Sequence, residues 1–195
     1  MRKKAWVALL LVCLGGVATA QRHGSFRTRG FYSAIDFGYA FNLNRGEGLN
    51  HEADTVAGYE MGISCGYQFS KEAGVGAGIT YISDQNSAFN IMPAFVELRS
   101  HYLKSNLSPY TVVQVGYSIP LGASATHVKI EKGGVYFGVA AGVRYSFSKA
   151  IALGIHGGYQ LVNLRQVDRY NGEPTPWLTG ATTLSIINAG LTLYF

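Results

Sequence analysis

The sequence predicts an all-β protein, an eight-stranded antiparallel up-and-down transmembrane β-barrel, and three observations support this fold class. Segments of about ten residues alternate between large apolar side chains and small or polar ones, as strands with two unlike faces do. The few charges within these segments lie on the glycine-rich face. The links between segments alternate between short and long. A soluble sandwich would place its charges outside, so the apolar faces are expected to contact lipid around a polar lumen.

The first four segments are 30–41, 55–69, 73–83 and 90–103. In each of them, most of the residues at alternate positions are large and apolar. Their apolar faces include, in order, Phe37 and Tyr39, Met61 and Ile63, Val75 and Ile79, and Met92 and Val96. The opposite faces are dominated by Gly, Ala and Ser. A period of two over each segment predicts a strand with one face in lipid.

The remaining segments are 110–121, 134–147, 151–163 and 184–195, and 134–147 is the most regular of all. Its apolar column consists of Val135, Phe137, Val139, Ala141, Val143, Tyr145 and Phe147. The last segment gives another column when read backwards from the chain end, with Phe195, Leu193, Leu191, Ala189 and Ile187. An unpaired edge strand invites aggregation, so a strand at the chain end is expected to close the barrel.

The links sort into two groups by length. The short links are 70–72, 104–109 and 148–150, and the longer ones are 42–54, 84–89, 122–133 and 164–180. Outer-membrane barrels combine short periplasmic turns with longer extracellular loops. With an even number of strands, both chain termini are therefore expected on the periplasmic side.

The N-terminal residues have the pattern of a signal peptide. A basic start at 1–4 is followed by an apolar run at 5–17, and Ala18-Thr-Ala20 then precedes Gln21. Small residues at these positions are typical of a cleavage site, and the run is too short to cross a bilayer comfortably. We predict a signal peptide at 1–20, cleaved after Ala20, and a barrel domain at 21–195.

Cleavage changes the meaning of the composition. The chain has 16 Lys and Arg against 11 Asp and Glu, but Arg2, Lys3 and Lys4 leave with the signal peptide, so 13 cations remain against 11 acids. This small excess gives no reason to expect nucleic-acid binding. Cys13 leaves as well, so Cys65 is the one cysteine of the predicted mature chain, and neither an intramolecular disulfide nor a cysteine zinc site is expected. No metal or other cofactor is expected.

The run Ile91-Met-Pro-Ala-Phe-Val-Glu-Leu-Arg99, followed by Ser108-Pro-Tyr110 and Gly116-Tyr117, resembles small eight-stranded outer-membrane β-barrel proteins of Gram-negative bacteria. The likeness is to porin-family, OmpA- and OmpX-like barrel domains of the Bacteroidota type. It implies a place in the outer membrane, contact with lipid and lipopolysaccharide, and insertion by the barrel assembly machinery. The C-terminal Phe195, with Leu193 and Leu191, resembles the assembly signal of such barrels. The resemblance implies no particular activity.

Several ionisable residues fall on the glycine-rich faces and therefore in the predicted lumen. They are Asp36, Glu60, Glu97, Arg99, Arg144 and His156. Buried charges are tolerated when they are paired and hydrogen-bonded. We expect an internal ionic network in which Arg99 and Arg144 neutralise Asp36 and Glu97. The alternative is a gate or proton-sensitive path in which His156 titrates near neutrality.

Three functions are compatible with this fold. The first is a structural or surface-interaction role without a wide pore, since large aqueous channels need about sixteen strands. The second is a lipid A-modifying or other barrel enzyme, for which His23, Ser25, His51 and His127 are the weak candidates; no enzymatic activity is expected. The third is an adhesin that binds an extracellular protein or glycan through the loop 164–180. Its candidate contact residues are Arg165, Arg169, Tyr170 and Trp177.

Overall fold

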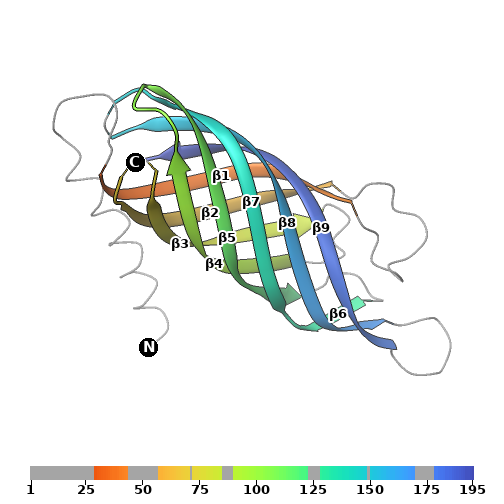
Figure 1. The fold of residues 1–195 in the computed structure, drawn as a ribbon. Coiled ribbons are helices and arrows are strands. Elements are labelled where there is room, and N and C mark those ends of the chain that lie inside the picture. The colour runs from red at the N-terminus through yellow and green to blue at the C-terminus, as the bar shows by residue number, and fades with distance from the viewer. Residues whose placement is uncertain are drawn as a thin grey trace.

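A computed structural model describes residues 29–43, 57–70, 72–84, 90–122, 128–148, 150–169 and 178–195. Within these ranges the chain forms antiparallel strands that belong to a single sheet (Figure 1). The strands are, in order, β1 (Gly30–Asn42), β2 (Ala57–Gln68), β3 (Gly74–Asp84), β4 (Asn90–His101), β5 (Leu107–Gly122), β6 (Val128–Lys132), β7 (Gly134–Ser146), β8 (Ala152–Arg169) and β9 (Leu178–Tyr194). None of the described residues lies in a helix long and apolar enough to cross a membrane.

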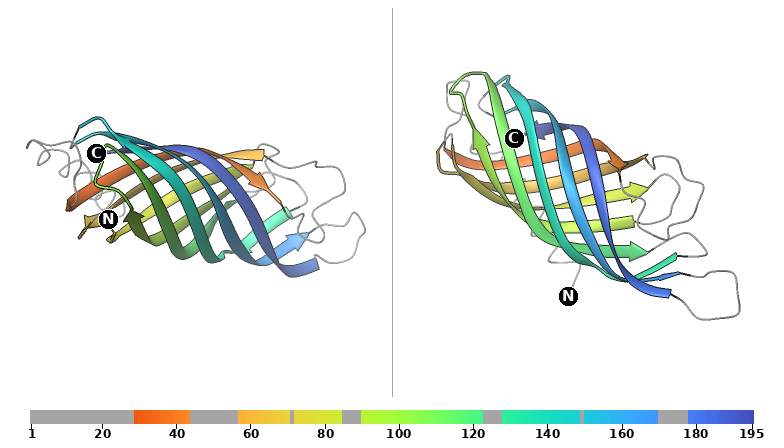
Figure 2. Two further views of the ribbon diagram at one scale, coloured as in Figure 1. Left: turned by 45° about the horizontal axis from the view of Figure 1, so that its top comes forward. Right: turned by 45° about the vertical axis from the view of Figure 1, so that its right-hand side comes forward.

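The sheet closes on itself. Apart from the short strand β6, each strand pairs with the next one along the chain, so that β5 pairs with β7. The last strand, β9, pairs with both β8 and β1, and Ala34 of β1 lies opposite Tyr194 of β9. Backbone hydrogen bonds between Ser33 and Phe195, at 2.9 and 3.2 Å, continue this seam to the last residue. The tilted strands wrap around a common axis in all three ribbon views (Figure 2).

The short strand β6 is an extension of β7. Both pair with β8, and their pairing registers differ by one residue between Lys132 and Tyr136, which indicates a bulge in the stretch that contains Gly133. A side-chain carbon at Gly133 would lie 1.6 Å from the carbonyl oxygen of Ser118, so only glycine fits there. β6 and β7 therefore act as one barrel strand, and the predicted eight-stranded antiparallel up-and-down barrel is confirmed.

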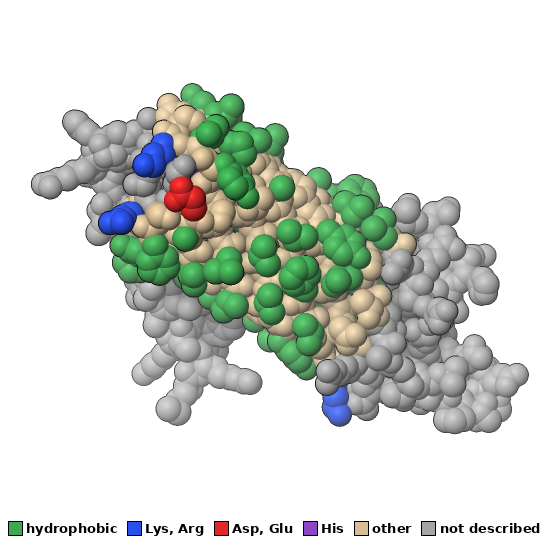
Figure 3. Space-filling view, in the orientation of Figure 1, with side chains coloured by type: hydrophobic (Ala, Val, Ile, Leu, Met, Phe, Trp, Pro, Cys, Tyr) green, Lys and Arg blue, Asp and Glu red, His purple; other side chains and the backbone are tan. Residues whose placement is uncertain are grey.

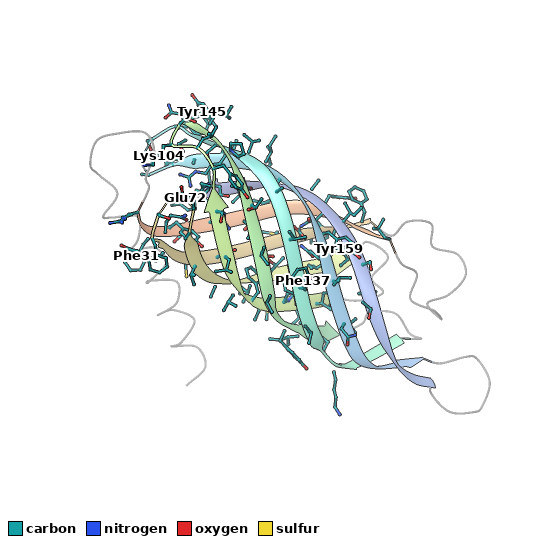
Figure 4. All side chains as sticks on the ribbon, viewed as in Figure 1. Phe31, Glu72, Lys104, Phe137, Tyr145 and Tyr159 are labelled. Carbon is teal, nitrogen blue, oxygen red and sulfur yellow. The ribbon has the colours of Figure 1, made fainter. Side chains whose placement is uncertain are left out.

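The large apolar side chains cover the outside of the barrel. On β7, Val135 and Phe137 are exposed while Tyr136 between them is fully buried. Green apolar side chains spread over the wall in Figure 3, and the charged ones visible there lie at the two ends. Figure 4 shows Phe137 and Tyr159 on the wall and Glu72 and Lys104 at one end. The predicted inside-out distribution of apolar residues is therefore the one that the structure has.

Two of the predicted loops are shorter than expected. In place of the predicted loop 164–180, β8 continues to Arg169 and β9 begins at Leu178, so both strands extend into this segment. Their ladder continues past a bulge between Leu164 and Val167. The loop 122–133 contains β6. Both errors arise because backbone pairing continues where the apolar alternation has stopped.

The interior has two layers, and the sequence predicted only one of them. Toward the end of the barrel that carries the longer links, inward side chains form an apolar cluster. Its buried members are Ala40, Ile82, Ile91, Phe95, Tyr136, Val162, Leu164, Leu184 and Ile186. Toward the end with the short links, polar and charged inward side chains lie beside a second, smaller apolar cluster. Its buried members are Ala34, Tyr110, Val112, Ala152 and Tyr194. The lumen is thus filled at one end by an apolar core and at the other by a polar network packed with tyrosine rings and small apolar side chains.

Candidate functional site in the barrel lumen

Arg99 is the centre of the polar layer. It comes from β4 and is 3% exposed, and its Nη2 donates to the two carboxylate oxygens of Glu97 at 3.0 and 3.2 Å. Its Nη1 donates to the hydroxyl of Tyr194 at 2.6 Å. Arg99 and Glu97 lie two residues apart on one strand, so both side chains point into the lumen.

Aromatic rings surround this ion pair. The Arg99 guanidinium carbon lies 5.3 Å from the ring centre of Tyr32, 5.9 Å from that of Tyr110 and 5.0 Å from that of Tyr194. Tyr32 also donates its hydroxyl hydrogen to Glu97 at 2.8 Å. Stacking on aromatic faces stabilises a guanidinium away from water. The arrangement holds a buried charge pair with its hydrogen-bonding groups largely engaged.

Arg144 lies nearer the short-link end. Its guanidinium contacts Nε2 of His101 at 3.3 Å and Oγ of Ser146 at 3.3 Å, and it stacks over the ring of Tyr194 at 5.0 Å. Tyr194 thus contacts two arginines, Arg99 from β4 and Arg144 from β7.

Asp36 belongs to a second group of polar contacts. Thr192 donates its hydroxyl hydrogen to Asp36 at 2.6 Å, and the same hydroxyl oxygen lies 3.1 Å from Nδ1 of His156. A hydroxyl has one hydrogen to give, so Nδ1 of His156 must be the donor in the second contact. The three residues form a directed chain from β8 through β9 to β1.

Glu60 is held by amides. Nδ2 of Asn188 donates to one of its carboxylate oxygens at 2.6 Å and Nε2 of Gln160 donates to the other at 3.0 Å. Glu60 is 4% exposed, and its two partners come from β9 and β8 across the lumen. The amide orientations are fixed because a flipped amide would turn an oxygen toward the carboxylate.

Two small cavities flank Arg99. One, of about 30 Å³, lies at the short-link end, and its lining includes Gln68, Arg99 and Arg144. The other, of about 40 Å³, lies deeper, and its lining includes Asp36, Glu60, Thr80, Arg99, His156, Gln160, Asn188 and Thr192. A cavity needs roughly 10–15 Å³ to hold one water molecule, so each has room for a few at most.

The structure thus places all six predicted lumen residues inside the barrel. Arg99 forms an ion pair with Glu97, and Asp36 is linked to His156 through the hydroxyl of Thr192. Glu60 accepts hydrogen bonds from two amides. The sequence reasoning missed the partners. Tyr32, Gln160, Asn188, Thr192 and Tyr194 stand at inward positions, which strand periodicity reveals. Periodicity does not reveal which strands face each other across the lumen.

The remaining candidates are only partly described. Arg165 lies in β8 at the bulge and Arg169 lies in β8 beyond it, whereas Tyr170 and Trp177 lie outside the described residues. The histidines and serine considered for catalysis also lie outside them; these are His23, Ser25, His51 and His127. Among the residues that the structure does describe, no group of three or more His, Cys, Asp or Glu side chains is placed to hold a metal ion.

Comparison with known proteins decides the family. The sequence model of the outer membrane protein beta-barrel domain matches residues 7–195. The chain belongs to this family. It is therefore an integral outer-membrane β-barrel protein, and its apolar exterior is the surface that contacts lipid. Its assignment to the Bacteroidota type stays a prediction.

Solved structures of the same fold agree with the family assignment. Neisserial surface protein A is 14% identical with a TM-score of 0.60, over 88% of this chain and 98% of that one. Outer membrane protein OprG from Pseudomonas aeruginosa is 14% identical with a TM-score of 0.55, over 87% and 98%. The N-terminal β-barrel domain of Pseudomonas aeruginosa OprF is 12% identical with a TM-score of 0.53, over 87% and 100%. At these identities the likeness shows the fold alone. No curated protein sequence matches the chain significantly.

Proposed function

We propose that this family member is a closed barrel that serves as a structural element of the outer membrane and holds its longer loops at the cell surface. The observation that supports the proposal is the filled lumen. An apolar cluster lies toward one end, Arg99 and its tyrosines occupy the other, and the cavities beside them measure about 40 and 30 Å³. A barrel of this strand number has an interior just wide enough for side chains.

Planar-bilayer recording tests the closed lumen. The purified mature barrel should give no stable conductance steps at neutral pH. Replacing Arg99 and Tyr194 together by Ala removes side chains from the polar layer but leaves the apolar cluster, so this variant should stay closed as well. Regular conductance steps from the wild-type protein would contradict the proposal.

We propose that the signal peptide is cleaved after Ala20 and that both termini of the mature barrel lie in the periplasm. The support for this orientation is the sorting of links, because Gly30 and Phe195 lie at the end where short links join β2 to β3, β4 to β5 and β7 to β8. An epitope inserted between residues 44 and 56 should be detected by antibody on intact cells. An epitope inserted at Lys104 should be detected only after the outer membrane is permeabilised.

A surface-binding function is the second candidate, and a specific feature favours it. The β8–β9 ladder continues past the bulge through Val167 opposite Gly180 to Arg169 opposite Leu178. Residues 170–177, which include Tyr170 and Trp177, follow this extension in the sequence. We expect Trp177→Ala and Arg169→Ala to reduce binding of whole cells to a host protein or glycan array, while Asn163→Ala leaves binding unchanged.

We further propose that the chain has no enzymatic activity. The alternative, a lipid A-modifying barrel, makes a direct chemical prediction. Mass spectrometry of lipid A from a deletion strain should match the wild-type profile. A change in acyl-chain number that the wild-type gene restores would establish the enzyme instead.

A further inference from the structure

The deeper cavity has two acceptor oxygens that receive no hydrogen bond among the described residues. They are Oε1 of Gln160 and Oδ1 of Asn188. Both side chains are 5% exposed, and both line the cavity of about 40 Å³. Their amide nitrogens are committed to Glu60, so the oxygens cannot be exchanged for donors by turning the amides over. A buried carbonyl oxygen without a hydrogen-bond partner destabilises the folded state.

The same region has an excess of negative charge. Among the described inward side chains there are three carboxylates, on Asp36, Glu60 and Glu97, and two guanidiniums, on Arg99 and Arg144. With both histidines neutral, one negative charge is left over. Arg99 is engaged with Glu97, so the excess lies with Asp36 and Glu60, which both line this cavity. An uncompensated charge in a low-dielectric interior is costly.

We propose that this cavity binds a monovalent cation such as sodium through Oε1 of Gln160, Oδ1 of Asn188 and the carboxylates of Asp36 and Glu60. Carboxylate and amide oxygens are the ligands that hard cations prefer. Each carboxylate oxygen of Glu60 accepts one amide hydrogen and keeps a lone pair for a further contact. A single positive charge balances the net excess in the lumen, whereas a divalent ion would reverse its sign.

Two other occupants are possible and make different predictions. A water molecule would satisfy the two amide oxygens but leave the charge excess. A proton on Glu60 would remove the charge and, with one amide turned over, would donate to one of the two amide oxygens, but it would leave the other without a donor. The cation answers both conditions at once, and it does so whether or not the lumen conducts.

Stability measured in different salts tests the proposal. The mature barrel is refolded in phosphatidylcholine vesicles, and its urea unfolding is followed by gel mobility in sodium chloride or choline chloride at one ionic strength. A ligand that binds only the folded state stabilises it by mass action. The unfolding equilibrium constant of the wild type should fall as sodium replaces choline, approaching tenfold for each tenfold rise in sodium above the dissociation constant.

Matched variants locate the effect. Gln160→Met keeps the side-chain size but removes the carbonyl oxygen, so the sodium dependence should disappear. Gln68→Met makes the same change in the other cavity, so the sodium dependence should persist. If Gln160→Met fails to fold, crystals of the wild type grown in thallium nitrate should show an anomalous peak between Gln160 and Asn188.

The contrary outcomes are distinct. Identical unfolding of the wild type in sodium and choline would overturn the proposal and leave water or a proton as the occupant. An equal sodium effect in the wild type and both variants would assign it to the lipid surface and would overturn the proposal too. Absence of the thallium peak would count the same way.

Discussion

At the scale of single residues, Arg99 has the most consequential environment in the barrel. It is buried, paired with Glu97, hydrogen-bonded to Tyr194 and surrounded by three aromatic rings. Removing one member of a buried ion pair leaves the other charge without compensation, which costs far more than replacing both members. The stability of the polar layer is therefore expected to depend on the pair as a unit.

We expect Arg99→Met to lower the free energy of unfolding by about 3–5 kcal/mol, because Glu97 then stays buried without a cation. The double variant Arg99→Met with Glu97→Gln should recover a large part of that loss. Urea unfolding in vesicles measures all four proteins of the cycle. Strict additivity of the two substitutions would show that the contact has no energetic weight.

Two glycines offer a sharper contrast between inside and outside. A side-chain carbon at Gly116 would lie 2.0 Å from the carbonyl oxygen of Ala94, whereas at Gly157 the nearest atom, the carbonyl oxygen of Asn188, is 3.7 Å away. Gly116→Ala should therefore push β5 from β4 and cost about 1–3 kcal/mol or more, while Gly157→Ala should be tolerated on the lipid face. The heat-modifiable folded fraction on a gel checks both, and equal behaviour of the two variants would mean that the described register is wrong.

At the scale of elements, the sequence reveals the strands far better than their partners. The alternation from Val135 to Phe147 identifies β7 and its lipid face, because a side-chain period of two is a local property. The contact between Glu97 and Arg99 is also local, since the two residues share a face of β4. The contacts of Glu60 with Gln160 and Asn188 join β2 to β8 and β9 across the lumen. They depend on how the barrel closes, which no single segment encodes.

The extension of β8 and β9 escaped the sequence analysis for a related reason. After Leu161, the next outward residue of β8 is the polar Asn163, and it lies opposite the polar Thr183 of β9. Nδ2 of Asn163 donates to the hydroxyl of Thr183 at 3.1 Å. Lipid contact no longer dictates an apolar alternation there, although backbone pairing continues. We expect the membrane-spanning part of the wall to end, on the side with the longer links, where the outward residues become polar.

Because the extension lies beyond that limit, we expect it to be dispensable for folding. Replacing residues 166–180 by a two-residue Asn-Gly turn keeps the pairing register of Leu164 with Thr182 and should leave heat-modifiable mobility and urea stability close to wild type. The same deletion should abolish any cell-surface binding that the loop provides. Loss of folding on deletion would show instead that the extension is part of the barrel's stabilising structure.

The terminal strand has a proposed role in assembly, and its end can be tested apart from stability. Phe195→Ala should lower the amount of folded protein in the outer membrane several-fold, whereas folding of the purified chain in vesicles should change little. Phe147→Ala, an exposed aromatic residue at the same end, is the matched control. If both variants reduce membrane levels equally, the effect belongs to the aromatic rim and not to the chain end.

At the scale of the whole molecule, the barrel has a distribution of polar and apolar side chains that is inverted relative to a soluble protein. Apolar residues face outward, charges such as Glu97 and Arg99 are buried, and the ends of the barrel differ in what fills them. A closed sheet with this distribution hydrogen-bonds its own backbone and needs no water in the bilayer core. The two-layer lumen is a consequence of the same inversion, because side chains that would cover a soluble protein have only the interior to occupy.

A nitroxide scan of β7 tests this central claim most directly. In a Cys65→Ala background, cysteines are placed singly at positions 135–146 other than Gly138 and Gly142, where a side chain would collide with neighbouring atoms. Each variant is spin-labelled in vesicles and measured for collision with oxygen and with a water-soluble nickel complex. The account predicts that oxygen accessibility oscillates with a period of two and is highest at the odd positions from Val135 to Tyr145. A flat profile, or maxima at the even positions with access to the nickel complex at Phe137 and Val139, would contradict it.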